Sequence, residues 1–562
     1  MEPSSQADTA RPKTTTRRPR RKKPAAPNGN PVSKMLDSVR IRMYRQGLGD
    51  CFLVSFTNTA GEQHHMMIDC GVLPFSKGGN QRLDLAAQDI LKVTGNHVNT
   101  VVATHEHADH ISGFASAAEY FGSDPKKKAK KKLAVDKVWL AWTEDLNDPQ
   151  TRRIVSNAQA LNLAVAATVH GLGAERSKAI QDILLFNGAV SEEDAGQGGS
   201  NGMGLAGDEG SGGKFHISSS MVKIMDLLRA WVPAVDFLEP GDTRTLETFG
   251  VKFHILGPSR KMSMLGGGAP AGARAPVQAL TPLRAFLAAA AQQTGFEIDT
   301  EGEEGWSPSD IESMQRLSMP FDASRSLTLE EAAEDYPLKD NARYPEKLQA
   351  KYREYYQTVY GKGDKEDEGR CPDYYGATWR RIDHDWLGLG ERLALQQVST
   401  INNTSLVLAI ELLESGKVLL FAADAEEDSW QTWEADDNRL DDLLARTVVY
   451  KVGHHGSVNA TDPHMFGEKM CNKELVALIP VDVSKAKQKE WEFPASSLYQ
   501  PQAARPEDRG LIYTNTGGRV VMNCPDFCED TEPAYKDQPP WPGKLTKDDS
   551  PDRLWVDYEL KF

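Results

Sequence analysis

Short hydrophobic runs recur along the first part of the chain, and segments with apolar residues at helical spacing lie between them. The runs predict strands at 40–44, 51–56, 65–69, 98–103 and 135–140. The helical spacing predicts helices at 83–93 and 112–121. Strands that alternate with helices indicate an α/β fold, in which helices cover the faces of the sheets.

The same pattern recurs further along the chain. Hydrophobic runs predict strands at 251–258, 405–410, 418–421 and 447–452, and the pair 510–514 and 518–522 predicts a closing hairpin. Between these parts, residues 278–395 predict a large, mostly helical insertion, in which 345–360 has a stripe of tyrosines typical of a packing surface. Glycine-rich stretches at about 190–213 and 262–277 predict flexible insertions.

The chain therefore divides into four segments. Residues 1–37 are rich in Pro, Thr, Lys and Arg, which predicts a disordered basic tail. The main domain is expected in two parts, at 38–277 and at 396–562 with a C-terminal extension, on either side of the insertion at 278–395. The basic run at 17–23 fits a polyanion-binding segment or a solvated tail, and both interpretations stay open.

Composition narrows the class of protein. No apolar run among the 562 residues approaches the length of a membrane span, and the polar, basic N-terminal region has no apolar stretch typical of a secretory signal, so we expect no membrane association. The six cysteines are scattered, which favours a reducing cytoplasmic location over a disulfide framework. A net charge of −15 argues against a surface that coats nucleic acid, but the lysines of 126–132 or a bound metal could offset phosphate repulsion locally.

Potential metal ligands are concentrated directly after the strand predicted at 98–103, in the run His105-Glu106-His107-Ala108-Asp109-His110. On an extended loop, His105 and His107 point to the same side and can close on one ion. Asp109 and His110, further round the turn, can reach a second ion. Imidazole nitrogens with a carboxylate oxygen suit zinc, manganese or iron. The end of a strand is where α/β folds tend to place their sites, so this run predicts the active site of a metal-dependent hydrolase.

These residues resemble a known family. Residues 104–113, THEHADHISG, are similar to the HxHxDH signature of metallo-β-lactamase-fold hydrolases. Further elements resemble, in the same order, the branch that contains the hydrolase domain of competence DNA-uptake channels: GLGDCFLV at 47–54, IDCG at 68–71, NNTSLVL at 402–408, LLFAAD at 419–424 and KVGHHGS at 451–457. The resemblance covers about 39–260 and 395–525 and implies a four-layer αββα sandwich that binds two divalent metal ions, zinc or manganese.

The resemblance also implies individual roles. Asp424 would bridge the two metals, although a helix N-cap is an alternative interpretation. Asp69 would support the metal-binding histidines from behind, or serve only as a turn residue before Gly71. One histidine of His454 and His455 would be the distal ligand of the second metal, and the other would pack nearby; we slightly favour His454 as the ligand.

One family ligand has no counterpart here. A further histidine is expected between the HxHxDH motif and Asp424, to complete the shell of the first metal. His170 and His216 lie in that interval without a matching motif, and Glu144 or Asp145 could substitute. The first metal site is thus less complete than the second.

The chemistry expected of such a site is hydrolysis by a metal-activated water, which Asp109 would orient or deprotonate. Lys451 could contact a substrate phosphate, but we favour an exposed lysine at the end of a strand. The leading hypothesis is a phosphodiesterase, and a nuclease in particular, because the resembling branch degrades DNA. The alternatives are a hydrolase of a small ester or amide, and a metal-binding interaction module with a degenerate site.

Overall fold

In the computed structural model, the described residues are 36–123, 132–155, 220–261, 389–523 and 540–562, with short gaps inside these ranges and isolated positions between 158 and 204. Most of the predicted tail, of the lysine run, of both glycine-rich stretches and of the predicted helical insertion lies outside the described residues. His170 and His216 also lie outside them.

The first sheet has eight strands in the order β16-β17-β1-β2-β3-β4-β5-β8. Its strands from β16 to β3 pair antiparallel, and β3, β4, β5 and β8 pair parallel. The bounds are Leu36–Tyr44 (β1), Cys51–Asn58 (β2), Gln63–Cys70 (β3), His97–Val102 (β4), Ala134–Ala141 (β5), Val235–Leu238 (β8), Lys544–Lys547 (β16) and Trp555–Lys561 (β17). Ala189–Val190 (β6) and Met203–Gly204 (β7) form a separate short pair.

The second sheet has seven strands in the order β15-β14-β13-β12-β11-β10-β9. It is parallel from β15 to β12 and antiparallel from β12 to β9. Its bounds are Thr243–Leu246 (β9), Val251–Gly257 (β10), Val407–Leu412 (β11), Lys417–Phe421 (β12), Thr447–Lys451 (β13), Val476–Ile479 (β14) and Val520–Met522 (β15). Each sheet is thus mixed, with a parallel and an antiparallel part.

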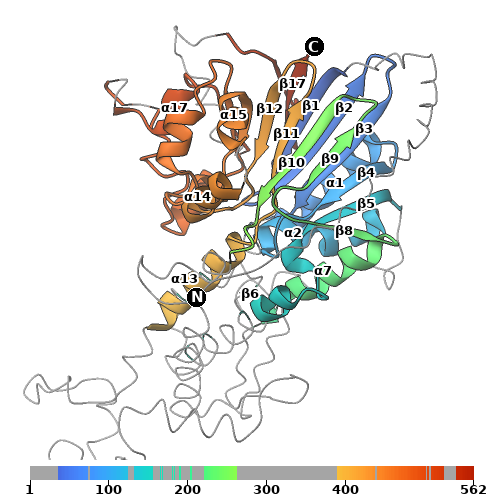
Figure 1. Cartoon of the computed structure of the whole chain (residues 1–562). Helices are drawn as coiled ribbons and strands as arrows, with labels where there is room; N and C mark the ends of the chain where they lie inside the picture. Colours follow the sequence, from blue (N-terminus) through green and yellow to red (C-terminus); the bar gives the residue numbers. More distant parts are fainter. Residues whose placement is uncertain are drawn as a thin grey trace, which may run out of the picture.

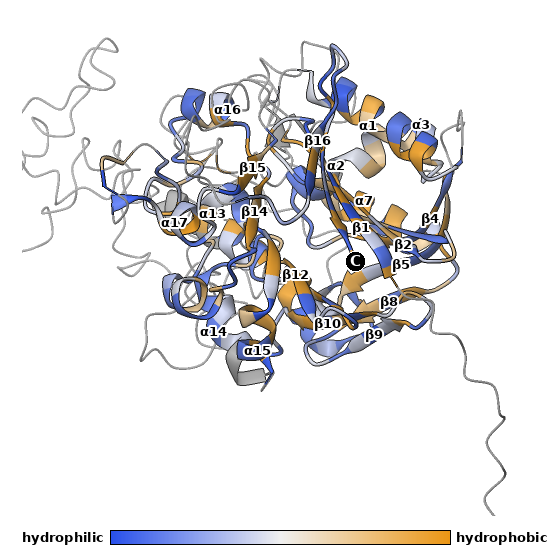
Figure 2. Cartoon of the chain, turned by 90° about the horizontal axis from the view of Figure 1, so that it is seen from above, coloured by the Kyte–Doolittle hydropathy of each residue, from blue (hydrophilic) through white to orange (hydrophobic). Residues whose placement is uncertain are grey.

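Helices lie on the outer faces of the two sheets (Figures 1 and 2). The first sheet is covered by Gly79–Val93 (α1), Ala108–Ser116 (α2), Ala118–Phe121 (α3) and Ser220–Trp231 (α7). The second is covered by Glu427–Asp436 (α14), Leu440–Ala445 (α15) and Leu511–Asn515 (α17); Leu389–Asn402 (α13) and Val483–Gln488 (α16) are further helices. Among the described residues, no helix has the length and apolar composition needed to cross a bilayer.

The inner faces of the two sheets pack against each other through large apolar side chains. Phe52 of β2 meets Phe421 of β12 with ring centroids 5.7 Å apart. Phe253 of β10 meets both Phe56 at 6.2 Å and Trp139 at 5.2 Å. Such edge-to-face aromatic pairs add to the gain from burying apolar area. This shared core fixes the strand ends of one sheet relative to those of the other.

The predicted α/β class is confirmed, but three local predictions need correction. The closing hairpin is wrong, because Leu511–Asn515 is helix α17, which buries Ile512 and Tyr513, and β15 pairs parallel with β14. Parallel strands require a crossover rather than a tight turn. The helix predicted at 112–121 begins earlier, at Ala108 inside the histidine motif, and divides into α2 and α3. The predicted tail is two residues too long, since β1 begins at Leu36.

Candidate functional site

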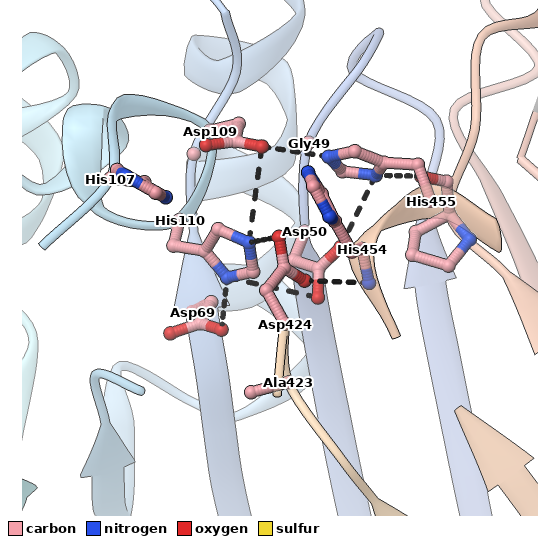
Figure 3. Close-up of polar contacts among 12 residues, drawn as sticks. Gly49, Asp50, Asp69, His107, Asp109, His110, Ala423, Asp424, His454 and His455 are labelled. Atoms are coloured by element: carbon pink, nitrogen blue, oxygen red, sulfur yellow. Dashed lines mark hydrogen bonds and ion pairs between the residues drawn. The ribbon is translucent and has the colours of Figure 1, made fainter. Parts of the chain in front are cut away.

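Two parallel strand pairs, β3 with β4 and β12 with β13, bring the predicted site residues together. Asp69 lies near the end of β3, and the histidine motif follows β4. Asp424 follows β12, and His454 and His455 follow β13. Figure 3 shows these side chains converging from the two sheets. Parallel strands carry their carboxyl ends to one edge, so sequence segments some 300 residues apart share one site.

A tight group of four side chains is formed by Asp109, His110, Asp424 and His455. Each offers one donor atom, all of these atoms lie within 4.8 Å of one another, and all four residues are buried. Asp109 Oδ2 lies 2.7 Å from His455 Nε2, and Asp424 Oδ2 lies 3.1 Å from His110 Nε2. Two imidazole nitrogens and two carboxylates at this spacing could hold a metal ion.

Three polar atoms in this group have no hydrogen-bond partner among the described residues: Asp109 Oδ1, His110 Nε2 and Asp424 Oδ2. The last two face each other without hydrogen-bond alignment. Leaving buried polar atoms unsatisfied is costly, and a cation between them would satisfy all three. The group therefore fits a metal ion in its geometry as well as in its chemistry.

Groups behind the metal-facing atoms fix the orientation of both imidazole rings. His110 Nδ1 lies 2.7 Å from Asp69 Oδ2, and His455 Nδ1 lies 2.6 Å from the carbonyl oxygen of Pro480. Asp69 also accepts hydrogen bonds from the backbone N–H and the hydroxyl of Thr104, at 2.8 and 2.7 Å. When Nδ1 donates, Nε2 keeps its lone pair, and both Nε2 atoms belong to the group of four. Asp69 is thus more than a turn residue.

The structure places His455, rather than the slightly favoured His454, in the group of four. Both residues have left-handed backbone, with φ of 54° and 43°, so the alternation expected of an extended chain does not apply to them. The backbone N–H of His454 donates to Asp424 Oδ1 at 2.9 Å. The sequence could not show which ring reaches Asp109, because that depends on this turn.

His105 and His107 form a separate pair beside the group. His105 Nε2 lies 3.1 Å from His107 Nδ1, and both side chains are buried. Among the described residues, no third histidine, cysteine or carboxylate gathers with both of them as closely as the four ligands gather. Glu144 instead pairs with Arg229 at 2.8 Å, and Asp145 accepts hydrogen bonds from Asn147. Neither proposed substitute completes the first site.

Lys451 is an internal cation, and its interpretation as an exposed lysine is wrong. Its side chain is 1% exposed, with Nζ 2.5 Å from Asp50 Oδ2 and 3.2 Å from Asp424 Oδ1. Nζ also donates to the carbonyl oxygen of Ala423 at 2.8 Å. Sequence reasoning did not assign a role to Asp50, although the GxGD motif that contains it was the available signal.

Charges within the site shift its pKa values in opposite directions. Burial lowers the pKa of His110, but the carboxylates of Asp424 and Asp50 outweigh burial and hold it well above its usual range. Burial raises the pKa of Asp424, but His110 and Lys451 bring it well below its usual range. The pKa of His455 is also raised, since its bond to Asp109 opposes the effect of burial. Without a metal, His110 and His455 therefore hold their protons more strongly than an ordinary histidine, whereas burial lowers the pKa of His105, His107 and His454.

Glycines let the backbone of the histidine motif approach strands β2 and β3. A Cβ on Gly49 would lie 2.5 Å from the carbonyl oxygen of Gly71 and 2.6 Å from that of Asp109. A Cβ on Gly71 would overlap the backbone of Asp109 and His110. In this close approach, the N–H of Asp50 donates to the carbonyl of Asp109 at 2.8 Å. The glycines of the GxGD and IDxG motifs are thus required because a side chain at Gly49 or Gly71 would overlap the neighbouring backbone.

Comparison of the chain with known proteins finds no matching family model, no matching curated protein and no matching solved structure. The family resemblance of the sequence therefore rests on its motifs alone. What the site can do has to be argued from its own geometry and charges.

Proposed function

We propose that this protein is a metal-dependent hydrolase with a metallo-β-lactamase-like fold, and that it cleaves phosphodiester bonds. The observation that carries the proposal is the buried group of Asp109, His110, Asp424 and His455, in which three polar atoms have no partner among the described residues. A second support is the arrangement of the motifs. Each lies at the beginning or the end of a strand in one of two facing mixed sheets, in the chain order of the family they resemble.

The donor set suggests which metals would bind. Two imidazole nitrogens with two carboxylates favour zinc or manganese. Asp109, His110, Asp424 and His455 would hold one ion, and His105 and His107 would contribute to a second. Bound divalent ions would lower the pKa of a water molecule and neutralise charge on a phosphoryl oxygen.

The chain's own residues would then position the reactants. Asp109 has one oxygen held by His455 and a second oxygen without a partner, so it can orient the attacking water or take its proton. Asp69 holds the ring of His110, and Lys451 holds the carboxylate of Asp424. These outer contacts keep the reacting groups in place before substrate binds.

A phosphodiester suits this site better than a neutral amide, because a site with two divalent ions stabilises negative charge on the attacking and leaving oxygens. A nucleic acid is the substrate we expect first, with a small phosphodiester as the simpler member of the same class. The test must distinguish this proposal from two alternatives. One is hydrolysis of an ester or amide, and the other is a degenerate module that binds metal without turnover.

The test combines metal analysis with a substrate panel. Protein purified without added metal is analysed for zinc, manganese and iron, then assayed on DNA, RNA and bis-p-nitrophenyl phosphate. The double variant Asp109→Ala/His110→Ala should lose the metal of the group of four and all activity. His464→Ala is the control, since that imidazole is 63% exposed and pairs with Glu468 of the same segment. Unchanged metal in the double variant would refute the site, and two bound metals without phosphodiester cleavage would refute the substrate class.

A further inference from the structure

The pair His105 and His107 needs another ligand to hold a metal, and the third histidine that the family motif provides has no counterpart among the described residues. The proposed function leaves this gap open, and the following inference rests on that proposal. The residue that fills the gap should be a nitrogen or oxygen donor beside Asp424, with its ring or carboxylate fixed from behind. His454 lies beside Asp424 and has its ring fixed from behind, although it does not gather with His105 and His107 as tightly as the group of four gathers.

Hydrogen bonds fix which nitrogen of His454 carries the proton. Ser457 Oγ donates to Asn459 Oδ1 at 2.6 Å, so its hydrogen is already used. The same Oγ lies 3.0 Å from His454 Nδ1 and accepts from it; this contact is shorter than that of the Asn402 amide Nδ2, which can only donate and lies 3.5 Å from the same nitrogen. Neutral His454 then has its lone pair on Nε2, the form in which a histidine binds metal through that nitrogen.

His105 is fixed in the same way. Thr104 Oγ1 donates to Asp69 Oδ2 at 2.7 Å and lies 3.1 Å from His105 Nδ1, so it accepts from that nitrogen. His105 Nε2 thereby keeps its lone pair and lies 3.1 Å from His107 Nδ1. The same outer support is found at His110 and His455, whose rings belong to the group of four. His454 thus shares the arrangement of the residues that face the metal positions.

The backbone shows that both adjacent histidines are directed to the site. His454 and His455 have φ of 43° and 54°, and two consecutive non-glycine residues in left-handed backbone are costly. Strain of this kind persists where a functional geometry requires it. It brings the two rings to the same cluster, where their centroids are 6.1 Å apart (Figure 3).

His454 also lies beside the residue that two metals would share. Its N–H donates to Asp424 Oδ1, while His110 approaches Asp424 Oδ2. His454 also acts on His107: the pKa of His107 is lowered to about 4, chiefly by burial, and the charge of His454 contributes to that lowering. At 8% exposure, His454 lies nearer the surface than Asp109, His107 or His455, which are fully buried.

We infer that His454 is a ligand of the first metal and replaces the missing family histidine. The first ion would be held by His105, His107 and His454 with Asp424, and the second by Asp109, His110 and His455 with the same Asp424. Consecutive histidines of one turn would thereby serve two different ions. The wall behind His454 includes Asn402 at the end of α13, whose Nδ2 donates to Glu426 Oε1 at 3.0 Å.

The test is a count of metal ions per chain. His454→Asn is the variant of choice, because asparagine tolerates left-handed backbone and lacks the imidazole. Elemental analysis and calorimetric titration with zinc should give about two ions for the unaltered chain and about one for this variant. His455→Asn should also retain about one ion, but this would be the first ion, so its affinity should differ from that of the ion kept by His454→Asn. The exposed His464→Asn should keep both.

Two results would overturn the inference: two ions in His454→Asn, or only one ion in the unaltered chain. Circular dichroism and a melting curve check the fold of each variant, and His454→Gln repeats the count should His454→Asn unfold. The outcomes separate this inference from the proposed function. Retention of both metals in His454→Asn removes His454 from the site and leaves the hydrolase proposal standing, whereas an unchanged metal count in Asp109→Ala/His110→Ala removes the hydrolase proposal itself.

Discussion

Lys451→Met removes the only lysine or arginine among the described residues that contacts the carboxylates Asp50 and Asp424. The side chain is 1% exposed, and methionine has similar length and volume, so packing is largely kept while the charge is lost. The carbonyl of Ala423 also loses its donor. Asp50 and Asp424 would then lose the lysine that contacts both of them and would keep His110 as a neighbouring cation.

The size of the effect follows from burial. Removing one partner of a buried ion pair costs about 3–5 kcal/mol, because the remaining charge is left unsolvated. Lys417→Met is a matched control: Lys417 pairs with Glu474 at 2.6 Å, but the two side chains are 29% and 46% exposed. Breaking an exposed pair costs about 0–1 kcal/mol. The two variants should therefore differ by at least about 2 kcal/mol in free energy of unfolding.

The pH dependence of Lys451→Met has a definite sign. Burial raises the pKa of Asp50, and the charge of Lys451 opposes that effect. Without Lys451, folded Asp50 holds a proton that the unfolded chain loses above about pH 3.9. The native state then binds more protons than the unfolded state, so the variant loses stability as pH rises from that value through the folded pKa.

The assay is urea denaturation followed by circular dichroism, with chelator and with saturating zinc. Zinc should restore part of the loss in Lys451→Met, since a cation beside Asp424 replaces some of the missing charge. Equal losses in Lys451→Met and Lys417→Met would refute the internal-cation role. Normal stability of Lys451→Met together with a raised KM would also refute that role, because this is the result expected of a lysine that binds substrate phosphate.

Three further predictions concern the residues of the proposed metal site. Asp69→Asn should weaken metal binding by about 10–100-fold with a modest loss of stability, because His110 loses its charged partner; unchanged affinity in a calorimetric titration would contradict this. Metal affinity should rise with pH, since the raised pKa values of His110 and His455 keep protons on them until metal displaces them. Titrations in buffers of different ionisation enthalpy should show proton release at about pH 7, and its absence would be the contrary result. By the same shifts, the metal-free chain should lose stability as pH rises above about 6.5.

The predictable part of this protein is the part set by local pattern. The buried strands β2, β3 and β4 each contain an apolar run, at 51–54, 66–68 and 101–102, because parallel and central strands are covered on both faces. The histidine motif could be located because metal chemistry needs several donors in few residues, and the strand before it fixed its place at a sheet edge.

What could not be predicted depends on tertiary contacts. Apolar residues at 511–513 fit a short strand or a helix equally well, and only the parallel pairing of β14 with β15 decides for the helix. Lys451 looks like any lysine at a strand end, and its burial depends on Asp50, which lies 401 positions earlier in the chain. The choice between His454 and His455 rests on two left-handed φ angles that no local pattern specifies.

The charge balance of the site connects the number of metals to the substrate. Four buried carboxylates, Asp50, Asp69, Asp109 and Asp424, are accompanied by one buried lysine, Lys451, so three negative charges are left when the histidines are neutral. One divalent ion leaves the site with a net negative charge, which repels a phosphodiester. A second ion makes the net charge positive and favours an anionic phosphoryl group. Phosphodiester cleavage therefore requires the first metal position to be filled, and a chain that binds only one ion is better suited to a neutral ester or to binding without turnover.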